Sequence, residues 1–169
     1  MDMEAAMKRI PPHSAEAEQA VLGAMLMNKE AITVASEILS GDDFYQTAYG
    51  ILFNSMVELF HAGKPVDLIT LQEYLKEKDV PPEISSMEFA RDLLMGTQTS
   101  ANIKSYAEIV REKSIMRRLI KVNEETANAC YLQNQPLEEI LEDAQKQVFA
   151  LAETGNSEEY VPVSYTHLR

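Results

Sequence analysis

The sequence predicts an all-α fold, in which a compact helical head of about five short helices is followed by a long antiparallel helical hairpin. Two observations support this fold class. Apolar residues recur three or four residues apart along most of the chain, which is the helical period. Glycines and prolines interrupt the chain often up to about residue 97, but none occurs from Ser100 to Leu132. Short helices should therefore give way to a long one.

The head is predicted to cover residues 14–97, after an irregular N-terminal arm over residues 1–13 that ends in Pro11-Pro12. Each head helix should begin at a residue whose side chain can accept a hydrogen bond from the first turn. These residues are Ser14, Asn28, the pair Asp42-Asp43, Asp67, and Ser85 or Ser86. Gly41, Gly63 and Gly96 are predicted to end helices. Gly50 should cost the third helix about 1 kcal/mol relative to alanine.

The hairpin is predicted to cover residues 98–153. Its first arm runs from about Ser100 to Leu132, and Pro136 suits the first position of the second arm. The apolar residues of the second arm are spaced 4, 3, 4 and 3 apart, as in a heptad seam. They are Leu137, Leu141, Ala144, Val148 and Leu151. Residues 154–169 are predicted to start a linker, and Tyr165–Arg169 has the character of a truncation end or a non-native scar.

The two arms of the hairpin carry opposite charge. Residues 104–121 contain six basic residues against two acidic ones, and residues 124–159 contain nine acidic residues against one lysine. This pattern favours attraction between the arms or between neighbouring chains. Two differently charged, solvated faces would give the same pattern.

The composition argues against several classes of protein. The net charge is −12, whereas a free-standing nucleic-acid binder usually presents a basic face. The single cysteine, Cys130, excludes an internal disulfide and fits a reducing cytosol. No apolar run approaches the roughly 20 residues that span a bilayer, and residues 1–10 lack a signal-peptide core. We therefore expect a cytoplasmic protein.

Motifs for catalysis or cofactor binding are absent from the sequence. Neither of the common glycine-rich phosphate-binding patterns occurs, and Gly63-Lys64 is better explained as a helix end. The three histidines are scattered, so no metal site is expected. Cys130 lies in a helical stretch, where we expect it to pack as a small apolar residue. The sequence thus predicts no catalytic, cofactor-binding or metal-ligating residues.

An interaction surface is predicted on the hairpin, because apolar residues surround much of the first arm and cannot all face one partner helix. Burial against the head would be the simpler explanation, but a projecting hairpin buries its apolar sides best by pairing. The predicted oligomer or partner interface consists of Ile115, Met116, Leu119, Ile120, Leu137, Leu141 and Val148.

Five segments, in order, resemble the N-terminal domain of bacterial DnaB-type replicative DNA helicases, over roughly residues 8–163. The opening segment is Arg9-Ile10-Pro11-Pro12-x-Ser14-x-Glu16-Ala17-Glu18-Gln19-Ala20-Val21-Leu22-Gly23. It is followed by Asp43-Phe44-Tyr45, Gly63-Lys64-Pro65-Val66-Asp67, Ser100-Ala101-Asn102-Ile103, and Tyr106-Ala107-x-Ile109-Val110-Arg111-Glu112-Lys113 with Arg117. Tyr49, Gly50 and Ser85-Ser86 depart from the family's usual residues.

The resemblance implies a role in DNA replication. In such helicases this domain pairs through its hairpins into dimers, and three dimers form a collar on a hexameric ring. Primase docks on the collar, a helicase loader is a further candidate partner, and DNA is bound only indirectly. ATP and magnesium belong to a RecA-like ATPase domain that would follow this segment, which should not unwind DNA alone. By the same resemblance, Phe89, Ile120 and Thr126 are candidate primase contacts, although ordinary packing would also explain Phe89.

Two other functions remain open. A small helical enzyme would need a concave pocket with converging titratable side chains. A DNA-binding module using Lys104 to Lys121 would bind with a steep dependence on salt.

Overall fold

The computed structural model describes the backbone of residues 9–97 and 99–167, and within these ranges the side chains of all residues except Met87 and residues 155–167. The described residues are helical, with no β-strand, which confirms the predicted fold class. Contacts divide the chain into two units. The head unit comprises residues 13–114, and the hairpin unit comprises the residues up to Pro12 together with those from Ile115 onward.

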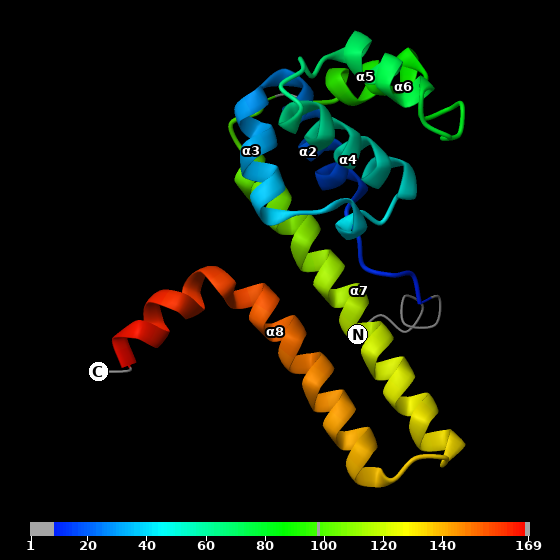
Figure 1. Cartoon of the computed structure of the whole chain (residues 1–169), viewed down its shortest axis with the longest axis vertical. Helices are drawn as coiled ribbons and strands as arrows, with labels where there is room; N and C mark the ends of the chain where they lie inside the picture. Colours follow the sequence, from blue (N-terminus) through cyan, green and yellow to red (C-terminus); the bar gives the residue numbers. More distant parts are fainter. Residues whose placement is uncertain (1–8, 98, 168–169) are drawn as a thin grey trace. The chain divides into compact units, whose positions relative to one another are not determined.

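Within the described residues, five α-helices precede the long hairpin helices, as predicted (Figure 1). They are α2 (Ala15–Met27), α3 (Lys29–Ile38), α4 (Thr47–His61), α5 (Leu68–Lys76) and α6 (Met87–Met95). A 3-10 turn, η1 (Gly41–Asp43), lies between α3 and α4. The head unit also contains the first turns of α7 (Ile103–Leu132), where Ile103, Ala107 and Val110 are buried in the core cluster.

Capping side chains begin four of these helices at the predicted residues. The backbone N–H of Ala17 donates to Ser14 Oγ, that of Glu30 to Asn28 Oδ1, and that of Thr70 to Asp67 Oδ1. Ser86 accepts from the N–H of Phe89 at 3.1 Å, so the Ser85-Ser86 departure still supplies a helix start. Gly63 follows α4 with a φ of +74°, a conformation that glycine adopts without strain.

The predicted start of the third helix at Asp42-Asp43 is wrong. Asp43 instead closes a capping box with Ser40 around the 3-10 turn η1, and α4 begins only at Thr47. Between them Phe44 is extended and buried, with its ring centroid 5.1 Å from that of Phe53. A side chain from far away in sequence holds the segment before α4: the buried Glu18 carboxylate accepts from the N–H groups of Tyr45 (2.8 Å) and Gln46 (3.3 Å).

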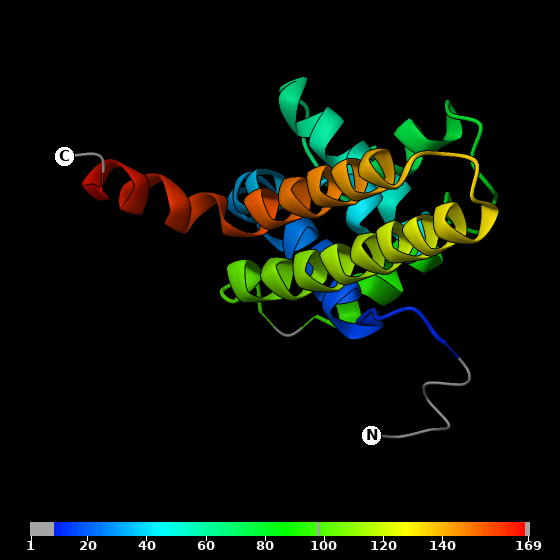
Figure 2. The ribbon, with the colours of Figure 1, turned by 90° about the horizontal axis from the view of Figure 1, so that it is seen from below.

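The hairpin consists of α7 and α8 (Leu137–His167), whose axes run antiparallel in the hairpin unit (Figures 1 and 2). Gln133 ends α7 with a φ of +51° and begins the loop to Pro136. The division between the units falls within α7, after Ser114, whereas the sequence placed the hairpin from residue 98. The backbone of residues 154–167 is helical, and their assignment as the start of a linker stays a prediction. Residues 168–169 of the predicted tail lie outside the described residues.

Candidate partner-binding surfaces

The inner faces of the hairpin are marked by two buried apolar residues. Val122 on α7 is 8% exposed and Ile140 on α8 is 7% exposed, while Ala144 and Leu151 are half-buried. The other apolar residues of the heptad spacing on α8, Leu137, Leu141 and Val148, do not turn inward and are exposed. The physical reason is that the apolar face of α8 is wider than a single seam, so one edge is buried and the other remains exposed.

The predicted interface residues lie on both arms of the hairpin, and most are exposed. Exposed fractions are 40% for Met116, 39% for Leu119, 44% for Ile120, 66% for Leu137, 59% for Leu141 and 42% for Val148. Ile115 is half-buried. Phe149, which the sequence prediction left out, is 62% exposed on α8. Phe149 shares a helix face with the polar residues Glu142, Gln145 and Glu153. The apolar periodicity of α8 therefore does not indicate that it belongs to an interface.

The prediction that Cys130 packs as a small apolar residue is wrong. Its side chain is exposed near the end of α7. It lies seven and fourteen residues after Asn123 and Met116, two exposed positions on the same face of the helix.

The N-terminal arm and α7 together form a groove in the hairpin unit. Arg9, Ile10 and Pro11 line one side, and α7 contributes one face of side chains to the other. These side chains are Arg117, Ile120, Lys121 and Glu124. The cavity volume is about 720 Å³. Arg117 holds the arm in place, since its Nη1 donates to the carbonyl oxygen of Pro12 at 2.8 Å.

This groove was not found from the sequence because its two sides are more than 100 residues apart. Its lining combines three cations and the carboxylate of Glu124 with an isoleucine on each side. Ile120, a predicted partner contact, lines the groove, whereas Thr126 is half-buried and donates from Oγ1 to the Val122 carbonyl.

Phe89, the third candidate primase contact, lies in the head unit. Its side chain is only partly buried, and its ring centroid is 5.8 Å from that of Tyr49. Tyr49 in turn accepts a hydrogen bond of 2.9 Å at its hydroxyl from Gln19 Nε2. Tyr49, one of the departures from the family pattern, thus links α2, α4 and α6 around Phe89.

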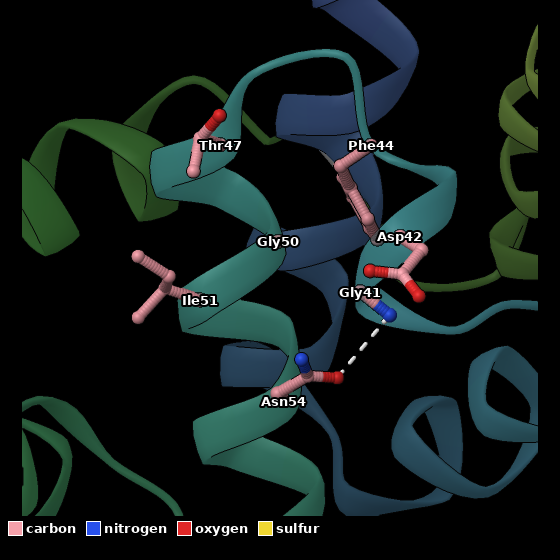
Figure 3. Close-up of a pocket in the computed structure, with 7 residues that line it drawn as sticks. All are labelled: Gly41, Asp42, Phe44, Thr47, Gly50, Ile51 and Asn54. Atoms are coloured by element: carbon pink, nitrogen blue, oxygen red, sulfur yellow. Dashed lines mark hydrogen bonds between the residues drawn. The ribbon is translucent and has the colours of Figure 1, made fainter.

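A smaller pocket of about 310 Å³ lies between η1 and α4 (Figure 3). Asn54 closes one end, where its Oδ1 accepts from the N–H of Gly41 at 3.2 Å. Gly41 and Gly50 approach so closely that a Cβ on Gly50 would lie 2.5 Å from the Gly41 carbonyl oxygen. This contact explains the unusual glycine at position 50. Asp42 is the titratable residue in the lining, so the pocket does not bring together the acid–base groups that an enzyme needs.

Shifted pKa values occur in a different place, where α4 meets the turn after α5. Lys78 Nζ lies 2.7 Å from Glu58 Oε1, and the Tyr74 hydroxyl donates to the same oxygen. These hydrogen bonds, from Lys78 first and then Tyr74, lower the pKa of Glu58. The bond to Glu58 raises the pKa of Lys78 and of Tyr74. The cluster is largely exposed, and its geometry is that of a surface link between two elements.

Two kinds of site are absent from the described residues. No group of three or more histidine, cysteine, aspartate or glutamate side chains is placed to hold a metal ion. No helix there is both long and apolar enough to cross a membrane.

The model of the DnaB-like helicase N-terminal domain matches residues 10–112, which is more than half of the sequence. The chain belongs to this family. The matched range contains the N-terminal arm from Ile10, all five head helices and the part of α7 that is packed into the head. The resemblance inferred from the five segments is confirmed.

Known members of the DnaB family align with most of this chain. The replicative DNA helicase DnaB of Pasteurella multocida is 40% identical over 145 residues, which are 85% of this chain and 31% of the relative. The crystal structure of the N-terminal domain of DnaB helicase from Mycobacterium tuberculosis superposes with a TM-score of 0.78 at 31% identity. It covers 83% of this chain and 99% of that one.

The N-terminal domain of DnaB helicase from Helicobacter pylori, described together with its interactions with primase, shares the fold. Its TM-score is 0.60 at 20% identity, over 78% of this chain and 99% of that one. The chain spans about a third of the length of the curated relatives that it matches. It corresponds to the N-terminal domain of the replicative DNA helicases in this family.

Proposed function

We propose that this chain is the assembly and primase-docking domain of a replicative DNA helicase, acting through its hairpin. One observation carries the proposal: both arms of the hairpin leave large apolar side chains in solvent. Met116 and Ile120 on α7 and Leu137, Leu141 and Phe149 on α8 are each 40–66% exposed. Exposed apolar side chains that gather on one element favour an interaction site there.

The assembly that the proposal specifies is a dimer formed by hairpin pairing, with three dimers forming a ring. Two-fold pairing would bury the exposed edge of α8 that the chain's own α7 leaves uncovered. The wider complex includes primase, because the related Helicobacter pylori domain was described with its primase interactions. A helicase loader is a further partner of the same collar. ATP-driven unwinding would belong to a following part of the whole protein.

The experiment is analytical ultracentrifugation over a wide range of protein concentration. We expect a concentration-dependent dimer or larger species. The double substitution Leu137→Ser, Leu141→Ser should weaken it, because it removes exposed apolar surface from α8. Ile69→Ser is the matched control, since Ile69 is 67% exposed on α5 in the head unit and should not affect self-association. A wild-type chain that stays monomeric at every concentration would contradict the proposal.

Primase docking is tested by calorimetric titration with the C-terminal domain of a primase from the same genome. Phe89→Ala and Ile120→Ala should each weaken binding, whereas Ile69→Ala should not. Circular dichroism must show that the variants remain folded. Equal affinity of all variants would remove these residues from the docking surface, and an absence of binding by the wild type would remove primase as a partner.

A further inference from the structure

The groove between the N-terminal arm and α7 has the length of a small molecule. Its α7 side runs from Arg117 to Glu124, seven residues further on, which at 1.5 Å per residue is about 10 Å. The facing segment, Arg9 to Pro11, spans at most about 10 Å. A docked helix or strand of a partner protein would extend beyond both ends of this groove. The cavity volume of about 720 Å³ lies within the usual range of ligand pockets, roughly 300–1,000 Å³.

Two cations of the lining have no counter-ion in the protein. Among the residues that the structure describes, neither Arg9 nor Lys121 forms an ion pair. They lie on facing sides of the groove, Arg9 on the arm and Lys121 on α7. Arg117, one helical turn before Lys121, adds a third positive charge. Cations on facing sides favour an anion between them, and a phosphate can accept two parallel hydrogen bonds from one arginine.

Exposed apolar side chains accompany these charges in the lining. Ile10 on the arm is 63% exposed and Ile120 on α7 is 44% exposed, and Pro11 adds further apolar surface. Removing such surface from water favours binding. An inorganic anion would leave it in solvent, so the lining fits an anion that also carries an apolar group.

The remaining lining residue, Glu124, narrows the class of ligand further. Its side chain is exposed, and an ionised carboxylate can only accept hydrogen bonds. A fatty acid or an alkyl phosphate would offer it no donor. A nucleoside phosphate matches all three parts of the lining, because it combines charged phosphates, a flat base with large weakly polar faces, and hydroxyl or amino donors.

We propose that the groove binds a nucleoside diphosphate. The phosphates lie between Arg9 and Lys121, and the base covers Ile10 and Ile120. Glu124 accepts from a ribose hydroxyl or from an amino group of the base. The sequence has no glycine-rich phosphate-binding loop, so side chains hold the phosphates in place of backbone N–H groups. This binding activity goes beyond the proposed function and does not depend on hairpin pairing.

Calorimetric titration of the complete chain with ADP, in low-salt buffer containing EDTA, tests the site without magnesium. Adenosine and inorganic pyrophosphate are the partial probes. Each should bind at least about tenfold more weakly than ADP, because each leaves part of the lining unused. Arg9→Met and Lys121→Met should each weaken ADP binding about tenfold, since each removes a charge-assisted hydrogen bond and keeps an apolar side chain.

Glu124→Leu separates the two halves of the ligand. It should weaken the binding of ADP by about threefold or more and leave the binding of pyrophosphate no weaker, because only the nucleoside contacts Glu124. Two matched controls change exposed residues outside the groove: Lys104→Met on α7, and Glu125→Leu beside Glu124. Both should bind ADP within about threefold of the wild type. Circular dichroism shows whether each variant remains folded.

The outcomes decide the proposal in either direction. Saturable ADP binding that Arg9→Met and Lys121→Met weaken, and that the controls retain, supports the site. Pyrophosphate that binds as tightly as ADP overturns the nucleotide and shows an anion site alone. A loss in Lys104→Met equal to that in Lys121→Met overturns the site, because general charge would then explain the binding. A wild type that does not bind ADP at about 10 mM overturns it as well.

Discussion

Ser114 and Asp43 meet inside the head unit, where Ser114 Oγ donates a hydrogen bond of 2.8 Å to Asp43 Oδ1. The other carboxylate oxygen of Asp43 accepts from the N–H of Ser40 at the same distance. One buried carboxylate therefore fastens α7 to the turn that precedes α4.

Ser114→Ala should destabilise the head, because it removes the hydroxyl donor from a buried acceptor. The expected loss is about 1–3 kcal/mol in the free energy of unfolding. Urea denaturation followed by circular dichroism measures it. Ser105→Ala is the control, since Ser105 is exposed on the same helix and its loss should change the free energy by less than about 0.5 kcal/mol. Equal stability of the two variants would contradict the role of the bond.

Gly50→Ala should also destabilise the head, although alanine favours a helix by about 1 kcal/mol over glycine. The new Cβ would lie 2.5 Å from the carbonyl oxygen of Gly41, and backbone atoms must move to relieve the clash. Overpacking of this kind costs about 1–3 kcal/mol. Gly96→Ala is the comparison, because the nearest atom to its Cβ would be 3.4 Å away. If thermal denaturation finds Gly50→Ala more stable than the wild type, the close approach is not a constraint.

Glu18→Gln should weaken the start of α4. The Glu18 carboxylate accepts from two backbone N–H groups, and the amide keeps only one acceptor oxygen. We expect a loss of about 1–3 kcal/mol and faster hydrogen exchange at Tyr45 and Gln46. Glu16→Gln, an exposed residue in the first turn of the same helix, should leave both measurements unchanged. Unaltered exchange at these two amides in Glu18→Gln would contradict this role of the Glu18 carboxylate.

Acidification should remove the link between Glu58 and Lys78. The pKa of Glu58 is lowered in the folded chain from its usual 4.5, so its contribution to stability is present above that value. The contribution is lost as the pH falls through the lower, folded-state pKa. An NMR titration of the Glu58 carboxyl should give a higher pKa in Lys78→Met than in the wild type. An unchanged titration would show that Lys78 does not stabilise the carboxylate.

The sequence predicted local structure better than long-range structure. Ser14, Asn28 and Asp67 were identified as caps because each bonds within three residues of itself. The start of α4 was misplaced because Glu18, which holds the segment before it, lies 27 residues before Tyr45. No periodicity in the Asp42–Gln46 segment indicates such a partner.

The hairpin shows the same limit. Its first arm is predicted by the absence of glycine and proline from Ser100 to Leu132, and the start of its second arm is predicted by Pro136. The sequence does not indicate which edge of α8 turns inward. Ile140 and Leu141 are both apolar, and only packing decides which of the two is buried. The groove required the N-terminal arm to fold back on α7, a contact that no local pattern records.

The exposed thiol of Cys130 offers a site on the hairpin for attaching a probe that reports distances between chains. It is the single cysteine of the sequence. A nitroxide spin label or a fluorophore attached there would report on one defined position per chain, without any engineered cysteine. In a symmetric dimer the two labels give one distance, so pulsed electron paramagnetic resonance could measure how far apart the two first arms lie at that point.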